Sequence, residues 1–387
     1  MSANENRTSL AGPLDGVRVI ELAGQGPGPY ACMLLAGLGA DVIRVDRLSA
    51  ARPTHPETDI HARGRRSIAL DLKQPRAVEI VLDLIEGADV LIEGYRPGVT
   101  ERLGLGPAEC LRRNPRLVYG RMTGWGQDGP LAQAAGHDIN YLALTGALHA
   151  VGEQDGSPVP PLNLVADYGG GGAMLALGVL AALLDASSSG QGQVVDAAMV
   201  DGVATMMAPF YALAARGAWV DERGSNILDG AAPFYGVYRT SDDRFVAVGA
   251  IEPQFYARLL AGLGLDPAEL PPQLDRAGWP AVKARVAEIF ATRSRDEWTA
   301  VFDGEDACVT PVLSLREAVA TPLARARGMF PLVDGVPSAA PAPRFSRCAP
   351  AAPGRVEASG ASTDAVLRSL GLEESDVAKL RETGVAG

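Results

Sequence analysis

The first half of the chain alternates short β-rich runs with longer stretches whose apolar residues recur at helical spacing. Helical spacing marks residues 30–38 and 75–85, and Pro75 stands in a first turn, where proline is favoured. The β-rich runs lie around them, at residues 17–22, 41–45, 67–70, 90–93 and 117–121. Strands that alternate with helices predict βαβ units and a parallel sheet. Because crossovers in such sheets are right-handed, the pattern predicts an α/β fold with a large Rossmann-like domain.

The pattern changes in the second half. Two apolar stretches of helical character come first, and a strand–turn–strand pattern and amphipathic helices follow them. In order, these predicted elements cover residues 173–184, 194–215, 239–248, 254–263 and 279–302. A stretch rich in Pro, Ala, Gly and Ser follows, which is typical of a linker. We therefore predict the first part of a large domain at 1–225, a smaller α+β domain at 226–330, and a linker with a helical tail at 331–387.

Composition and charge narrow the class of protein. A single core rarely serves 387 residues, so at least two domains are expected. Lys and Arg number 35 and Asp and Glu number 46, so a net charge of −11 disfavours general binding to nucleic acid or anionic membranes. The four cysteines form no CxxC pair, which indicates free thiols, a cytoplasmic protein and no metal site. The longest apolar run, residues 173–184, is too short to span a bilayer, so no membrane partner is predicted.

A glycine-rich turn follows the first predicted strand. Gly24, Gly26 and Gly28 invite a dinucleotide-binding interpretation, but the fingerprint G-x-G-x-x-G needs glycine where Pro29 stands. Asp46 ends the second strand, where a ribose-binding acid would lie. We favour a tight strand-to-helix turn over NAD binding, because the fingerprint is incomplete.

A basic segment stands out in this acidic chain. Between Arg44 and Arg76 there are eight basic and four acidic residues, and Arg96 and Arg102 follow the strand at 90–93. These groups would lie near the carboxyl ends of adjacent strands, where open α/β sheets bind ligands. Since arginine suits phosphate, one interpretation is a site for a small polyphosphate, and the other is ordinary surface charge.

Three side chains are candidates for acid–base chemistry. His137 has the residue type best suited to a general base near neutral pH, although a lone histidine is often structural. Asp167 precedes four glycines and an apolar helix, so it is either a helix cap or a carboxylate beside free backbone N–H groups that bind an anion. Glu252 follows a predicted strand and is either a site residue or another cap. Of the other histidines, His55 and His61 are placed in a polar loop, where they are either site or surface residues, and His149 is packed or solvated.

Several strings together resemble family III CoA transferases. They include LGADV at 38–42, EGYRPG at 93–98, GWG at 124–126 and the Asp167 glycine segment, and the resemblance runs from about Leu14 to Gly384. Within that family, GHDINY at 136–141 and GAIEPQF at 249–255 resemble the α-methylacyl-CoA racemase branch.

The resemblance implies a fold and a ligand. It implies a large Rossmann-like domain with a smaller α+β domain, a C-terminal segment that returns to the large domain, and an interlaced homodimer. The ligand would be CoA, and no cofactor beyond the CoA moiety of an acyl-CoA substrate would be needed. The nucleotide end would be held by Arg47, Leu70, Asp71, Leu72, Lys73, Gly94, Tyr95, Arg96 and Arg102. The thioester end would be lined by Gly136, His137, Asp138, Ile139, Asn140 and Tyr141.

The activity that the resemblance implies is racemisation of 2-methylacyl-CoA thioesters. His137 would take the C2 proton of the S isomer while Asp167 donates one, the roles would reverse for the R isomer, and Glu252 would orient or tune His137. Backbone N–H groups at the start of the Asp167 helix would stabilise the enolate. The alternative is CoA transfer with Asp167 as nucleophile, although that branch usually has an aromatic residue where His137 stands. A non-catalytic CoA-binding protein is a third class, which His137, Asp167 and Glu252 disfavour.

Overall fold

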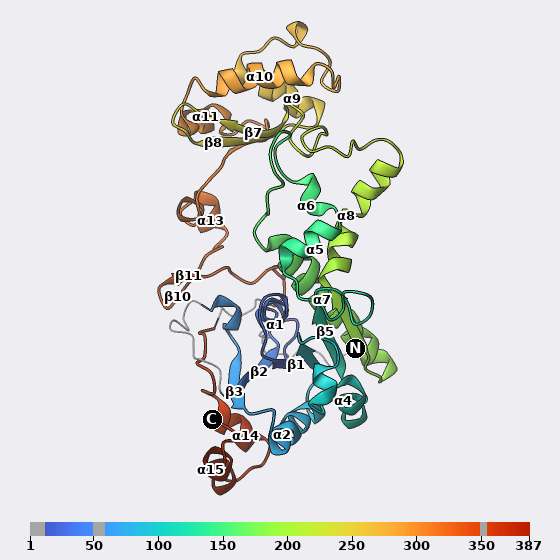
Figure 1. Ribbon diagram of the computed structural model, residues 1–387. Helices are drawn as coiled ribbons and strands as arrows, with labels where there is room; N and C mark the ends of the chain where they lie inside the picture. Colours follow the sequence, from blue (N-terminus) through green and yellow to red (C-terminus); the bar gives the residue numbers. More distant parts are fainter. Residues whose placement is uncertain (1–11, 49–58, 349–353) are drawn as a thin grey trace, which may run out of the picture. The chain divides into compact units, whose positions relative to one another are not determined.

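The computed structural model describes residues 12–48, 59–348 and 354–387, which form two compact units (Figure 1). The first unit comprises Met1–Thr145, Leu162–Met206 and Pro322–Gly387, and the second comprises Gly146–Pro161 and Met207–Thr321. The units therefore divide within the helix α8 (Met199–Ala215), whose first residues are buried and whose later residues are largely exposed. The sequence placed its boundaries at 225/226 and 330/331 instead, because no change of composition marks the middle of this apolar helix.

A six-stranded parallel sheet forms the centre of the first unit. Its order is β3-β2-β1-β4-β5-β6, which is the strand order of a doubly wound Rossmann sheet. The strands are β1 (Arg18–Leu22), β2 (Asp41–Arg47), β3 (Arg66–Leu70), β4 (Val90–Glu93), β5 (Val118–Thr123) and β6 (Val194–Ala198). The predicted α/β class with a parallel sheet is therefore confirmed. The prediction of one helix over residues 194–215 is wrong at its start, because residues 194–198 pair with β5 before α8 begins.

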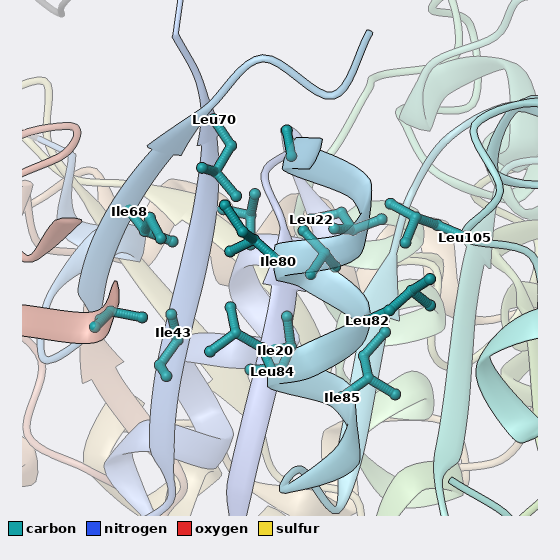
Figure 2. Packing of buried hydrophobic residues seen from close by; sticks show 14 of the residues in the cluster. Ile20, Leu22, Ile43, Ile68, Leu70, Ile80, Leu82, Leu84, Ile85 and Leu105 are labelled. Atoms are coloured by element: carbon teal, nitrogen blue, oxygen red, sulfur yellow. The ribbon is translucent and has the colours of Figure 1, made fainter. Parts of the chain in front are cut away.

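Helices pack on the sheet, and the inner strands β4 and β5 are buried as a result. The helices of this unit, apart from the C-terminal ones, are α1 (Pro27–Gly37), η2 (Ile60–Ala62), α2 (Pro75–Glu86), α3 (Val99–Arg102), α4 (Pro107–Arg113), α5 (Asp138–Leu144), η3 (Leu164–Ala173), α7 (Met174–Ser189) and α8. The buried residues of α2 recur at helical spacing, and Figure 2 shows its side chains directed at those of β1, β2 and β3. Ile20, Ile43, Ile68 and Ile80 are all 2% exposed or less within this core.

The C-terminal segment completes the first unit. Its elements are α13 (Pro322–Ala326), β10 (Leu332–Val333), β11 (Val336–Pro337), α14 (Thr363–Ser369) and α15 (Glu374–Glu382), and α14 packs beside β3 (Figure 1). Val366 and Leu367 are fully buried in the same core as the strands. The last residues of the chain add one antiparallel bridge, between Ala386 and Leu70. The end of the chain therefore helps to hold the edge of the sheet.

The helix at Leu164–Ser189 is longer than the sequence suggested. By length and composition alone it could cross a membrane, because the glycine segment before Met174 is itself helical. The expectation that this apolar helix is too short to span a bilayer is therefore wrong. The α7 part packs on β5, β6 and α1, and its buried residues form one stripe, which is the pattern of a helix that lies on a sheet.

The second unit has its own sheet and core. The strands β7 (Tyr235–Arg239), β8 (Phe245–Gly249) and β9 (Val309–Pro311) pair antiparallel, so the predicted strand–turn–strand is a hairpin. The helices are α6 (Ala147–Ala150), α9 (Pro253–Leu263), η4 (Pro267–Glu269), α10 (Trp279–Phe290), α11 (Arg295–Phe302) and α12 (Leu315–Ala318). Phe234, Tyr238, Phe290 and Trp298 form an aromatic core between this sheet and these helices.

Candidate active site

A cavity of about 910 Å³ opens at the carboxyl ends of β1, β2 and β4. The strand order reverses between β1 and β4, and such a switch point is where open α/β sheets bind ligands. The cavity is lined by the glycine turn after β1, by loops after β2 and β4, by η2 and by residues 356–359. The cavity therefore lies at the edge of the sheet where the sequence analysis expects the ligand.

Three of the predicted nucleotide-binding residues meet at this cavity. Arg47, Gly94 and Tyr95 all line it, and the Arg47 guanidinium lies 5.8 Å from the centroid of the Tyr95 ring, a cation–π contact. A planar ring beside a cation suits a ligand that carries both an aromatic base and phosphate groups.

The other predicted nucleotide-binding residues lie on neighbouring loops. Arg96 and Arg102 are exposed after β4, and Lys73 is exposed after β3, where its backbone N–H donates to Asp71 Oδ1. The Leu70 side chain is fully buried in the core, and Leu72 packs against that core. None of these residues lines the described cavity, so their ligand contacts stay predictions.

Among the described residues, three basic side chains of this segment form ion pairs with acids within the fold. Arg44 pairs with Asp46 at 2.9 Å, Arg66 pairs with Asp41 at 2.6 Å, and Arg65 pairs with Glu21. Part of the positive excess in the sequence is therefore structural, and Arg47 remains as the arginine that faces the cavity with an aromatic partner. Spacing alone could not reveal the partners of Arg65 and Arg66, because those acids lie on other strands, whereas Arg44 and Asp46 stand two residues apart on β2. Arg52 and His55 lie outside the described residues.

A buried ion pair lies beneath the cavity. The side chains of Glu21 and Arg65 are each 1% exposed, and both line the cavity wall. Cys32 on α1 packs beside them, and burial together with the Glu21 charge raises the pKa of its thiol well above the usual range. Cys32 is therefore an inert thiol near neutral pH.

His137 and Asp167 lie close together in the first unit. His137 is exposed at the start of α5, where its backbone N–H donates to Asn140 Oδ1 at 3.0 Å. Asp167 is partly buried in η3, and its Oδ2 accepts a hydrogen bond from Asn163 Nδ2 at 3.1 Å. Burial raises the pKa of Asp167, the charge of Asp138 raises it further, and His137 is near enough for its charge to lower it. The two candidate bases are thus within electrostatic reach of each other.

The carboxylate of Asp167 also adjoins the glycine turn. A Cβ atom added at Gly26 would lie 3.4 Å from Asp167 Oδ2, and Gly26 has a φ of 68°, which glycine adopts without strain. Gly26 lines the cavity. The glycine turn therefore lines the cavity and also lies beside the Asp167 carboxylate.

The four glycines after Asp167 have a different role from the one expected. Residues 164–173 form a π-helix, a wide form that is rare and often marks functional sites. Gly170, Gly171 and Gly172 are buried, and a Cβ at Gly171 would lie 2.8 Å from Met199 Cγ and 2.9 Å from Pro27 Cβ. The glycines lie inside a helix and let α1 and α8 approach it. The sequence analysis placed these glycines before the apolar helix, and the structure places them inside it.

Two backbone N–H groups near Asp167 are already bonded. Ala166 and Asp167 donate their backbone N–H groups to Asp138 Oδ2, at 2.8 and 2.9 Å. The expectation that N–H groups at this helix start are free for an enolate is therefore wrong for these two. The carboxylate that occupies them comes from α5, which sequence spacing does not reveal.

Tyr141 packs at the base of this region. Its ring meets Trp125 edge to face, with the centroids 4.7 Å apart, and a Cβ at Gly136 would lie 2.9 Å from the Tyr141 ring. Burial and the charges of Asp167 and Asp138 raise the pKa of Tyr141 to about 12. The segment from Gly136 to Tyr141 therefore folds around the candidate bases, with Asp138 and Tyr141 buried and Ile139 and Asn140 exposed.

Sequence reasoning missed one aromatic cluster at the cavity. Tyr30, His61 and Tyr168 contact one another, with ring centroids 4.6 to 6.1 Å apart. His61 lines the cavity and is partly buried, whereas the sequence left open whether it is a site or a surface residue. Burial lowers the pKa of His61, so its ring is predominantly neutral at pH 7. No local signal marks this cluster, because its rings come from α1, η2 and η3.

Glu252 lies in the second unit. It is the residue before α9, where its carbonyl oxygen accepts the N–H of Tyr256 at 2.9 Å, and its side chain is exposed. The role of orienting His137 stays a prediction. Within the part of the chain that the structure describes, no group of three or more His, Cys, Asp or Glu side chains gathers at metal-binding distance.

Comparisons with known proteins match this chain over most of its length. Residues 14–359 match the profile of CoA-transferase family III. A Mus musculus protein named alpha-methylacyl-CoA racemase is 48% identical over 371 residues, which cover 95% of this chain and 96% of that protein. A Homo sapiens protein of the same name is 48% identical over 317 residues, 82% of each chain. A solved CAIB/BAIF family protein from Brucella suis superimposes with a TM-score of 0.81 at 27% identity, and covers 93% of this chain and 99% of that one.

Proposed function

The chain belongs to CoA-transferase family III, and from this premise we propose that it interconverts the R and S forms of 2-methylacyl-CoA thioesters. The observation that carries the proposal is that Asp138, the residue after His137, binds the backbone N–H of Asp167 at 2.9 Å. This contact brings His137 and Asp167, two groups able to transfer protons, together in the unit that holds a ligand-sized cavity. The 48% identity to two proteins named alpha-methylacyl-CoA racemase supports the same activity.

The CoA portion of the substrate would occupy the cavity at the switch point. Its aromatic base suits the Tyr95 ring, and its phosphates suit Arg47 and the exposed arginines after β4. Contacts with this remote portion supply binding energy that positions the reacting carbon. No cofactor beyond the CoA moiety enters the proposed reaction.

The proton transfer uses two bases on opposite faces of C2. In the S isomer His137 removes the C2 proton, the electron pair moves to the thioester oxygen to give an enolate, and Asp167 delivers a proton to the other face. In the R isomer the roles reverse. The raised pKa of Asp167 supports its part as an acid, because burial and the Asp138 charge favour its protonated form. One proton leaves C2 and one returns, so the substrate and product differ only in configuration.

The second candidate is CoA transfer. There the Asp167 carboxylate would attack the thioester carbonyl and form an acyl anhydride, with CoA as leaving group. The position of Asp167 beside the glycine turn is compatible with such an attack. The histidine at position 137 favours proton transfer over this route, because transfer to a carboxylate nucleophile needs no second base at C2.

The test is NMR spectroscopy in deuterated water with one enantiomer of a 2-methylacyl-CoA. Racemisation predicts deuterium at C2 together with loss of optical purity. Lack of exchange, with CoA transfer to an added carboxylic acid, would refute racemisation and favour Asp167 as a nucleophile.

A homodimer is the proposed assembly. Leu177 and Leu184 lie on one face of α7 and are 61% and 74% exposed, although they are large and apolar. Leu144 on α5 is 65% exposed. Exposed leucines of this kind are typical of a contact surface. Light scattering after size exclusion should give twice the 40.3 kDa chain mass, and a mass of one chain would contradict the proposal.

A further inference from the structure

Asp138 is a buried carboxylate that the proposed mechanism does not use. Its side chain belongs to the first turn of α5, directly after His137, and the residue is only 6% exposed. Oδ2 accepts the two backbone N–H groups of Ala166 and Asp167, whereas Oδ1 is buried and has no hydrogen-bond partner among the described residues. A buried carboxylate oxygen without a hydrogen-bond partner is costly, so its retention calls for a reason.

These contacts make a short connection between the two candidate bases. His137 and Asp138 are consecutive, so the peptide bond joins the first base to the carboxylate. The carboxylate in turn binds the N–H of Asp167, the second base, at 2.9 Å. Hydrogen bonds from N–H groups to a carboxylate are roughly twice as strong as neutral ones, so this connection is stiff.

We propose that Asp138 is a positioning residue that fixes the backbone of Asp167 relative to His137. The inference rests on the proposed function, because a two-base reaction needs both bases held on opposite faces of one carbon. Misplacement of a reacting group by about 1 Å costs about 10²-fold in rate. The carboxylate of Asp138 holds the strand of backbone that carries Asp167, and no other side chain among the described residues is seen to bind that N–H.

The charge of Asp138 has a second effect on the same residue. Asp138 and His137, both at the start of α5, are the charged groups that act on Asp167, and Asn163 donates a hydrogen bond to it. The helices α1 and α7 and the strands β5 and β6 also pack on η3, and none of them contributes a described charge that acts on Asp167. The negative charge of Asp138 raises the pKa of Asp167 and so favours the proton-donating form.

Two substitutions separate the hydrogen bonds from the charge. Asp138→Asn keeps an acceptor oxygen of the same shape and removes the charge. Asp138→Ala removes both. Asp196→Asn is the control, because Asp196 is an exposed carboxylate of the same unit that accepts a backbone N–H from Gln127 and takes no part in the proposed reaction.

The readouts are C2 exchange of a single enantiomer across pH and titration of the Asp167 carboxylate by carbon-13 NMR. Asp138→Ala should lower kcat about 10²-fold with little change in KM. Asp138→Asn should restore most of kcat, and the pH at which S-isomer turnover falls on the alkaline side should move lower, together with the NMR titration of Asp167. Asp196→Asn should match the wild type.

The inference is overturned if Asp138→Ala retains wild-type kcat, or if Asp138→Asn leaves the Asp167 titration unmoved. Should Asp138→Ala fail to fold, the Asn variant alone decides the matter through the NMR titration. That titration needs no turnover, so a wild-type protein that shows no C2 exchange would refute the proposed function and leave the effect of Asp138 on Asp167 separately measurable.

Discussion

Gly172→Ala should destabilise the first unit, because Gly172 allows α1 to lie directly against η3. An added Cβ would lie 2.6 Å from the carbonyl oxygen of Pro27 and 2.7 Å from Cδ1 of Tyr30, whereas ordinary contact begins at 3.4 Å. The Pro27 oxygen is backbone at the start of α1, so it cannot rotate away as a side chain would. The methyl group therefore forces the start of α1 away from η3.

The size of the loss follows from two opposing terms. Overpacking of a well-packed interior costs about 1–3 kcal/mol, and replacing a helical glycine by alanine gains about 0.5–1 kcal/mol. The net expectation for Gly172→Ala is a loss of about 1–2 kcal/mol in the free energy of unfolding. Gly169→Ala is the matched control, because its Cβ would lie 3.3 Å from the Leu164 oxygen and 3.5 Å from the flexible end of Met206. At Gly169 the gain from replacing a helical glycine by alanine outweighs the steric cost, so the free energy of unfolding should be unchanged or rise by up to about 1 kcal/mol.

Urea unfolding followed by circular dichroism measures both variants against the wild type. The expected order of stability is Gly169→Ala at or above wild type, and Gly172→Ala below it. If Gly172→Ala were as stable as the wild type, the close approach of α1 and η3 would not constrain the chain. If both alanine variants lost equal stability, the run of glycines would serve backbone conformation, and our packing argument would be refuted.

Three further predictions concern charge. Glu21→Gln should cost about 3–5 kcal/mol of unfolding free energy, because it leaves Arg65 buried without its counter-ion, and a melt as stable as the wild type would contradict this. Asp167→Asn should stabilise the fold at pH 7. The raised pKa of Asp167 means that its ionised form is disfavoured in the folded state, so the gain should appear as pH rises above about 4, and should vanish below that pH in parallel melts. Arg47→Ala should weaken CoA binding by calorimetry, whereas Arg66→Ala, which loses an ion pair with Asp41 and does not line the cavity, should leave the affinity unchanged once folding is verified.

The sequence predicted the strands β1 to β5 because each is marked by a β-rich run of neighbouring residues. The strands β1 to β5 overlap the β-rich runs of the sequence, and α2 begins at Pro75, as predicted. The strand β6 was not predicted, because Val194–Ala198 is short and continues directly into an apolar helix. Its identity depends on pairing with β5, which is a contact across more than 70 residues of sequence.

The candidate site was predictable in its residue types and not in its contacts. His137 and Asp167 stand out by their chemistry, and their proximity supports the choice. The roles of Arg65 and Arg66 depended on acidic partners on other strands, which spacing does not reveal. The sequence placed His61 in a polar loop and Asp138 among the thioester-lining residues. Each gains its position from an element distant in sequence, His61 from α1 and η3, and Asp138 from η3.

The two-base assignment is the central claim, and stereospecific exchange by single-base variants tests it most directly. Asp167→Ala should still exchange the C2 proton of the S isomer through His137, with retention of configuration, and should leave the R isomer unexchanged. His137→Ala should show the opposite pattern, and neither variant should racemise. If either variant racemised at the wild-type rate, or if both exchanged the same enantiomer, then His137 and Asp167 would not be bases on opposite faces of C2.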